Sequence, residues 1–169
     1  MTTQIQIDGE IFQNTIKILK DLISFQTESG KSNLELIDYC ELKLKNSGAS
    51  SLKTFNNSKT QANLFSTIKG KNLNGTGIVL SGHTDVVPAV PDEWTSDPYI
   101  VREKNDKLYG RGTCDMKGFI ACTLAVAPLF ASSKLKRPIH FSYTFDEETG
   151  CLGAPLVLAD LKKRNLNFS

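Results

Sequence analysis

Two stretches in the first part of the chain have apolar residues that recur every three or four positions. In the first stretch these residues are Phe12, Ile16, Leu19 and Ile23, and in the second they are Leu34, Ile37, Cys40 or Glu41, and Leu44. This period predicts amphipathic helices over about Glu10–Phe25 and Leu34–Leu44. Ser32 or Asn33 is expected to cap the second helix, and Gly48 to follow its end.

The rest of the chain alternates short apolar runs with helical patterns. The runs predict strands at Ser51–Phe55, Asn63–Ile68, Ile78–Leu80 and Ile139–Phe145. Ile78–Leu80 is continuously apolar, which is typical of a buried central strand. Helices are predicted over Met116–Pro128 and Leu152–Lys163. The polar pair Asn105 and Asp106 predicts a hairpin turn between two further short strands.

This order of elements predicts the fold class. Strands that alternate with helices indicate an α/β domain with a mostly parallel sheet. Lys69–Gly77 is rich in glycine and asparagine and is expected to form a loop. In such sheets, functional groups gather in the loops at the carboxyl ends of strands. With 169 residues, the chain is expected to hold one domain or part of one.

Composition and charge narrow the classes of function. The chain is 40% hydrophobic and 22% charged, as an ordinary globular protein is, and its net charge of +2 predicts neither a nucleic-acid nor a membrane partner. The N-terminus lacks the pattern of a secretory signal, and the longest apolar run, Phe119–Ala131, is too short to span a bilayer. The four cysteines form no CxxC pair, which fits reduced thiols in a cytoplasmic protein.

The first motif with chemical potential is SGHTDVVP, over Ser81–Pro88. His83 directly follows a predicted strand, and Asp85 lies two residues further on. A metal-bound histidine usually donates its other ring nitrogen to a carboxylate or a carbonyl, and Asp85 is a candidate for that partner. The alternative is a histidine that only bonds a local aspartate in a turn.

The second motif is LYGRGTCDMKG, over Leu108–Gly118. Asp115 stands between a glycine-rich loop and a predicted helix, and its two oxygens suit one metal ion or a bridge between two. The alternative is simple N-capping of the helix by Asp115. Lys117 and Arg111 are expected to be solvated, and the alternative is that they stabilise local charge.

The third motif is FSYTFDEETGCLG, over Phe141–Gly153. A strand runs directly into Asp146, Glu147 and Glu148. Adjacent carboxylates repel one another, and a divalent cation offsets that repulsion. The alternative is a solvated acidic turn.

Taken together, the three motifs supply the donor types of a catalytic zinc site. Zinc binds histidine nitrogen and carboxylate oxygen, and a catalytic site keeps one position open. The metal activates water as a nucleophile, while a carboxylate that does not bind the metal transfers the proton. The combination therefore predicts metal-dependent hydrolysis.

These motifs resemble those of the zinc-dependent hydrolase family that includes acetylornithine deacetylases, succinyl-diaminopimelate desuccinylases, aminoacylases and glutamate carboxypeptidases. The resemblance extends along the chain through GHTDVVP, Trp94–Pro98, LYGRGTCDMKG and DEE, in the family's order. It implies a three-layer, zinc-exopeptidase-like catalytic domain. It also implies a cytoplasmic homodimer that holds two zinc ions per complete site, with cobalt as a possible substitute.

The resemblance also implies roles for five residues. His83 is expected to bind one zinc ion, Asp115 to bridge both, and Glu148 to bind the metal. Glu147 is expected to be the general base, and Asp85 to orient His83. The peptide bond that follows Asp115 is expected to be cis.

Within the family, Gly150–Gly153 and the surrounding residues are most similar to acetylornithine deacetylases. The implied reaction is hydrolysis of N-acetyl-L-ornithine to ornithine and acetate in arginine biosynthesis. Succinyl-diaminopimelate desuccinylase and related dipeptidases or carboxypeptidases are alternatives of the same class. A catalytically silent metal-binding or interaction module is the alternative of another class, and Glu147 argues against it because a structural metal site needs no spare base.

Family members are longer than this chain. They carry an inserted dimerisation domain and a C-terminal part of the catalytic domain, with a further acidic ligand and a late histidine ligand. Residues 1–169 are therefore expected to be the N-terminal part of the catalytic domain, incomplete and inactive alone. The part is expected to expose a sheet edge or an apolar face. His140 is expected to be structural and not the late ligand.

Overall fold

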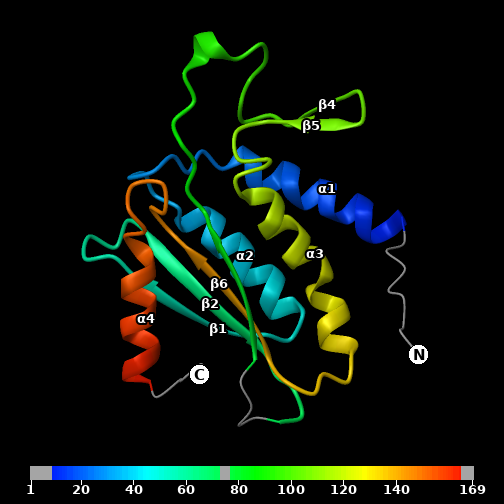
Figure 1. Ribbon diagram of the computed structural model, residues 1–169, viewed down its shortest axis with the longest axis vertical. Helices are drawn as coiled ribbons and strands as arrows, with labels where there is room; N and C mark the ends of the chain where they lie inside the picture. The colour runs from blue at the N-terminus through cyan, green and yellow to red at the C-terminus, as the bar shows by residue number, and fades with distance from the viewer. Residues whose placement is uncertain (1–8, 73–76, 165–169) are drawn as a thin grey trace.

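The computed structural model describes residues 9–72 and 77–164, which form one α/β unit (Figure 1). The helices are α1 (Gly9–Ser24), α2 (Leu34–Asn46), η1 (Pro91–Glu93), α3 (Lys117–Ser132) and α4 (Gly153–Lys163). The strands are β1 (Ser50–Phe55), β2 (Ala62–Ile68), β3 (Ile78–His83), β4 (Arg102–Lys104), β5 (Lys107–Tyr109) and β6 (Ile139–Thr144). The predicted helices and strands are therefore all present, with ends that differ by a few residues. Residues 73–76 of the expected loop Lys69–Gly77 lie outside the described residues.

The main sheet has the strand order β1-β2-β6-β3. The β3–β6 pair is parallel, whereas β1–β2 and β2–β6 are antiparallel, so the predicted mostly parallel sheet is wrong for the described residues. Only six residues, 56–61, join β1 to β2, and a parallel crossover needs a dozen or more. The long connection that contains α3 allows β3 and β6 to run in parallel.

The expected central position of β3 is also wrong, because β3 lies at the edge of this sheet. Ile78 is 62% exposed and Val79 is 42% exposed, whereas all six residues of β6 are buried. A continuous apolar run favours a buried strand, but the run alone does not show whether the strand lies in the centre or at the edge of the sheet. The expected exposure of a sheet edge is confirmed here.

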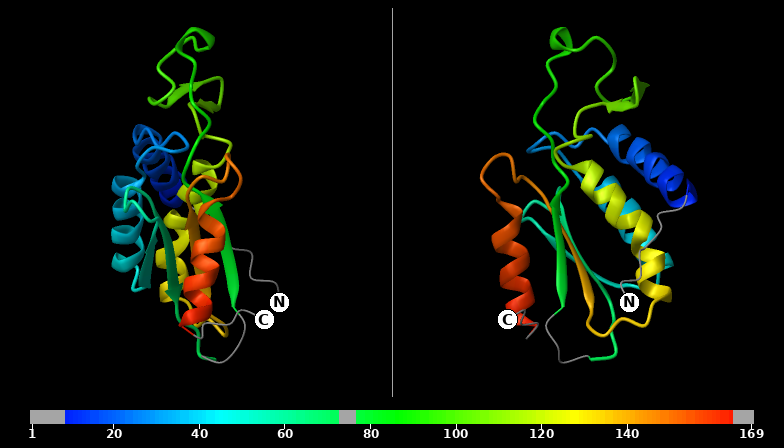
Figure 2. Two further views of the ribbon diagram at one scale, coloured as in Figure 1. Left: turned by 90° about the vertical axis from the view of Figure 1, so that its left-hand side faces the viewer. Right: turned by 45° about the vertical axis from the view of Figure 1, so that its right-hand side comes forward.

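Helices cover both faces of the sheet, which gives three layers (Figure 2). α2 and α3 pack on one face with α1 against α3, and α4 packs on the other face over β1, β2 and β6. The larger core lies beneath α1, α2 and α3 and includes Leu22, Leu64 and Phe141, all almost fully buried. A smaller core under α4 contains Phe65 and Val157. The expected three-layer arrangement is therefore confirmed.

The connection from β3 to α3 extends away from the sheet and carries the β4–β5 hairpin toward α1 (Figure 1). Asn105 and Asp106 have φ values of 52° and 57°, which two-residue hairpin turns require. The predicted turn is therefore confirmed. Lys20 on α1 forms an ion pair of 2.6 Å with Glu103 in the hairpin.

The ends of α2 are only partly as expected. Gly48 follows the helix with a φ of 79°, as predicted. Asn33 occupies the N-cap position, but its side chain makes no capping hydrogen bond. It donates instead to the carbonyl of Ala62 and to Thr84 Oγ1, both at 2.9 Å. Asn33 therefore joins the start of α2 to the sheet.

None of the helices in residues 9–72 and 77–164 has the length and apolar character to cross a membrane.

His140 has a structural position on β6, as expected. It is 6% exposed and stacks on Phe65 with ring centroids 5.4 Å apart. Its Nδ1 lies 2.8 Å from Thr67 Oγ1. Burial lowers the pKa of His140 below its ordinary value of 6.5, so the ring is neutral in the folded protein at pH 7.

Because burial favours the neutral form of His140, we expect this residue to lower the free energy of unfolding in acid. Because the folded pKa is below the unfolded one, the unfolded chain binds more protons as the pH falls through about 6.5, and stability is lost. His140→Gln keeps a partner for Thr67 and should make the unfolding free energy fall less between pH 7 and pH 5. Urea titrations at each pH measure this difference. Equal pH dependence in both proteins would contradict the prediction.

Candidate metal centre

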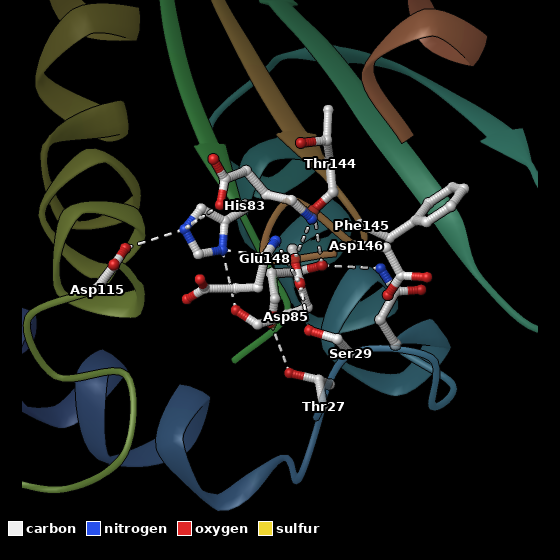
Figure 3. Close-up of polar contacts among 12 residues, drawn as sticks. Thr27, Ser29, His83, Asp85, Asp115, Thr144, Phe145, Asp146 and Glu148 are labelled. Atoms are coloured by element: carbon white, nitrogen blue, oxygen red, sulfur yellow. Dashed lines mark hydrogen bonds and ion pairs between the residues drawn. The ribbon is translucent and has the colours of Figure 1, made fainter. Parts of the chain in front are cut away.

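The chemical motifs meet at one end of the sheet, where β3 and β6 finish and α3 begins (Figure 3). His83 is the last residue of β3 and pairs in register with Thr144, the last residue of β6. Glu147 and Glu148 follow β6 after a short turn. Parallel neighbours end at the same edge of a sheet, so the first and third motifs come together there.

His83 is 4% exposed and presents its two ring nitrogens to different groups. Nδ1 lies 3.0 Å from the main-chain oxygen of Asp85 and 3.5 Å from its carboxylate. Nε2 lies 3.0 Å from Asp115 and 3.7 Å from Glu147. A proton on Nδ1 that bonds the carbonyl leaves Nε2 as the nitrogen that faces the acidic groups.

The carboxylate of Asp85 connects the first motif to the third. It is 2% exposed, and its oxygens accept hydrogen bonds from the amides of Glu147 (3.0 Å) and Glu148 (3.2 Å). Ser29 Oγ donates a third bond at 2.7 Å. Burial opposes ionisation of Asp85, but these bonds and His83 outweigh it and lower the pKa to about 2. Asp85 therefore positions the DEE turn as well as His83.

The three acidic residues of the DEE turn differ in their surroundings. Asp146 is buried with a φ of 50°, and it accepts hydrogen bonds of 2.8 Å from Gly30 and Gln61. Glu147 is exposed and Glu148 is half-buried. A uniformly solvated turn is therefore excluded, and only Glu147 and Glu148 remain available to a ligand.

Asp115 follows a glycine-rich loop whose main chain passes close to neighbouring side chains. Gly112 has a φ of 87°, and a Cβ there would lie 2.8 Å from the side chain of Val86, so both conformation and space require glycine. The N-cap of α3 is Met116, without a capping side chain, so Asp115 does not cap the helix. Its side chain is 72% exposed and faces His83. The peptide bond between Asp115 and Met116 is cis, as expected.

The donor set fits a divalent metal ion. His83, Glu147 and Glu148 each offer one atom, and these atoms all lie within 4.8 Å of one another. Asp115 offers a further oxygen, 3.0 Å from His83 Nε2, so the cluster holds more carboxylates than one metal ion needs. Burial opposes protonation of His83, but hydrogen bonds to Asp85 and Asp115 raise its pKa to about 9. Burial and the Asp115 carboxylate raise the pKa of Glu148. A site that stabilises positive charge on a nitrogen and opposes further negative charge favours a bound cation, and its donors are those that zinc prefers.

The site also depends on residues that the sequence did not indicate. The segment between α1 and α2 passes beside the DEE turn, where Ser29 bonds Asp85 and Gly30 bonds Asp146. Thr27 Oγ1 donates to the carbonyl of Thr84 at 2.5 Å. This segment has the polar composition of an ordinary connection, so no local pattern indicates its contacts.

The sequence predicts that Lys117 and Arg111 are solvated, and the structure differs from this prediction. Lys117 is fully buried and donates from Nζ to main-chain carbonyls, which corrects the prediction. The Arg111 guanidinium lies 5.3 Å from the ring centre of Trp94. The one available signal for Lys117 was its place at the start of a strongly apolar helix.

A pocket of about 440 Å³ adjoins the centre between α4 and the edge strand β3. Its lining includes His83, Glu147, Met116, Val79 and Leu158. His83 and Glu147 therefore border a largely apolar space.

Comparison with known proteins gives both sequence and structural matches. The model of peptidase family M20/M25/M40 matches residues 79–168. Acetylornithine deacetylase of Yersinia pseudotuberculosis is 44% identical over 105 residues, which cover 60% of this chain and 27% of that protein. Acetylornithine deacetylase of Salmonella paratyphi B is 42% identical over 92 residues, which cover 54% and 24%. The matched region thus spans about a quarter of these relatives.

Solved structures share the fold over most of the chain. An M20 family metallo-carboxypeptidase from Sulfolobus solfataricus aligns with a TM-score of 0.74 and 22% identity, over 94% of this chain and 35% of that one. Human carnosine dipeptidase 1 aligns with a TM-score of 0.70 and 23% identity, over 92% and 38%. At these identities the likeness shows the fold alone, and it confirms the expected zinc-exopeptidase-like fold.

The bonds of Asp85 predict a stability effect in this chain. Asp85→Asn places an amide NH₂ where a carboxylate oxygen accepts from other donors. The variant should unfold with a free energy lower by about 1–3 kcal/mol, because a buried polar group loses its partner. Urea denaturation of the metal-free protein measures this loss, with the exposed Asp92→Asn as the matched control. A loss no larger than that of the control would contradict the assigned bonds.

Proposed function

Because the chain belongs to peptidase family M20/M25/M40, we propose that it is part of a zinc-dependent amidohydrolase of the acetylornithine deacetylase type. The proposed reaction is hydrolysis of N-acetyl-L-ornithine to ornithine and acetate, in arginine biosynthesis. The observation that carries the proposal is the meeting of His83, Asp115, Glu147 and Glu148 at one end of the sheet. The similarity to acetylornithine deacetylases supports the choice of substrate.

We propose that His83, through Nε2, holds the metal together with Asp115 and Glu148. Asp85 fixes the imidazole from the Nδ1 side and holds the main chain of Glu148. The bound metal ion would supply Lewis acidity to the attacking water and to the amide carbonyl.

Glu147 is the proposed general base. Its side chain is 45% exposed, so the carboxylate has space to approach a substrate, and its amide is fixed by Asp85. Glu147 takes a proton from the attacking water and passes it to the departing amine of ornithine. Such proton transfer contributes roughly 10²- to 10⁴-fold to rate.

The whole protein is proposed to be a cytoplasmic homodimer with two metal ions per site, zinc or cobalt. Residues 1–169 are proposed to be the N-terminal part of its catalytic domain, because they match about a quarter of the deacetylase relatives. The dimerisation domain, the C-terminal part of the catalytic domain and the remaining metal ligands would belong to a longer protein. Residues 1–169 alone are expected to turn over no substrate.

Succinyl-diaminopimelate desuccinylase and dipeptidase activities are the alternatives within the same class. The deciding experiment assays the full-length protein with N-acetyl-L-ornithine, N-succinyl-LL-diaminopimelate and dipeptides, before and after chelation. The proposal expects the highest kcat/KM for N-acetyl-L-ornithine, its loss after chelation and its return with zinc. Hydrolysis that prefers another substrate would reject the deacetylase assignment, and activity unaffected by chelation would reject the metal site.

Glu147→Gln tests the proposed base in the same full-length protein. The amide cannot accept the proton, so kcat should fall by at least about 10²-fold while the zinc content stays close to that of the unsubstituted protein. Steady-state kinetics and metal analysis measure the two quantities. Glu93→Gln, at an exposed glutamate in η1, is the matched control and should leave both unchanged. Near-normal turnover by Glu147→Gln would remove Glu147 from the mechanism.

A further inference from the structure

Lys117 is a fully buried lysine whose ammonium group binds main chain. Its Nζ donates to the carbonyl oxygens of Leu22 at 3.0 Å and Phe25 at 2.7 Å. Both carbonyls lie at the C-terminal end of α1, where the helix dipole favours a cation. A buried lysine is rare because its charge loses hydration, so these two bonds must offset a substantial cost.

The same residue fixes the loop that carries Asp115. Lys117 is the first residue of α3, and its amide donates to the carbonyl of Gly112 at 2.9 Å. Its side-chain carbons pass close to Gly112, where an added Cβ would lie 3.3 Å from Lys117 Cδ. Asp115 is two residues earlier in the chain. Lys117 therefore joins the end of α1 to one side of the candidate metal centre.

A path of hydrogen bonds and connecting main chain leads from Phe25 to the opposite side of the centre. The amide of Thr27 donates to the carbonyl of Phe25 at 2.9 Å. Two residues further on, Ser29 Oγ donates to Asp85. Asp85 in turn accepts hydrogen bonds from the amides of Glu147 and Glu148. Figure 3 shows Ser29, Asp85 and Glu148 beside one another. The segment held by Lys117 is therefore the segment that supports the DEE turn.

We propose that Lys117 is a positioning residue that sets Asp115 and the Glu147–Glu148 turn at the spacing a shared metal ion requires. It acts through the main chain of residues 25–30 and touches no reacting atom. The inference rests on the proposed function, since the spacing matters for a metal ion that these carboxylates bind. A lysine that served only stability would change the unfolding free energy without a selective effect on this turn.

The test compares three variants of this chain by amide hydrogen exchange in the metal-free state and by zinc calorimetry. Lys117→Met removes the charge and the donors but keeps an unbranched apolar side chain. Ser29→Ala cuts the same path at its other end. Leu44→Ala, in the core near the end of α2, is the control for a loss of stability.

Lys117→Met should speed exchange at the amides of Gly30, Glu147 and Glu148 beyond the change in Leu44→Ala, and should weaken zinc binding by roughly 10- to 100-fold. Ser29→Ala should affect the same amides, with a smaller loss of affinity. The inference would be overturned if exchange at these three amides changed no more in Lys117→Met than in Leu44→Ala.

The outcome remains decisive in two further cases. If Lys117→Met does not fold, Ser29→Ala decides, and unchanged exchange at Glu147 and Glu148 in that variant overturns the inference. If the unsubstituted chain binds no zinc, the proposed metal site fails, while the exchange measurements still judge the positioning role.

Discussion

The parallel pairing of β3 with β6 is the constraint on which the site depends. It brings His83 and the DEE turn to the same end of the sheet, although more than sixty residues separate them. The connection between these strands contains α3, which begins two residues after Asp115. One crossover unit, β3–α3–β6, therefore delivers all the candidate ligands, and the antiparallel strands β1 and β2 only extend the sheet that supports it.

The second requirement is control of negative charge. Of the carboxylates at this end of the sheet, Asp85 and Asp146 are buried and have their oxygens occupied by donors from the protein. Asp115, Glu147 and Glu148 have far fewer such bonds, and their carboxylates lie near His83. The protein thus separates carboxylates that build the site from carboxylates that are free to bind. This separation, rather than the number of acidic residues, is what favours a cation at this position.

The sequence predicted features that depend on local spacing. The amphipathic period placed α1 within one residue at each end, and Asn105 and Asp106 marked the hairpin turn. The motifs identified His83, Asp85 and Asp115 as neighbours, and the structure brings them together.

Features set by distant contacts were not predicted. Strand direction depended on the short β1–β2 connection and was wrong in the prediction. The apolar run Ile78–Leu80 did not indicate an edge strand, because hydrophobicity alone does not show whether a neighbouring strand pairs with each side of the run. The burial of Lys117 requires carbonyls about ninety residues earlier in the chain, and the role of Ser29 requires Asp85. The apolar character of α3 is a local hint that Lys117 is buried, but no local pattern identifies the partners of Lys117 or of Ser29.

Anomalous diffraction at the zinc edge, from crystals of this chain grown with zinc, would locate the metal ion itself. We expect a peak within about 2.0–2.2 Å of His83 Nε2 and of oxygens from Asp115 and Glu148. Asp85 should remain on the Nδ1 side of the ring and outside the coordination sphere. A peak bound through Nδ1, or zinc only at other surface sites, would contradict the assignment of this cluster as the metal centre.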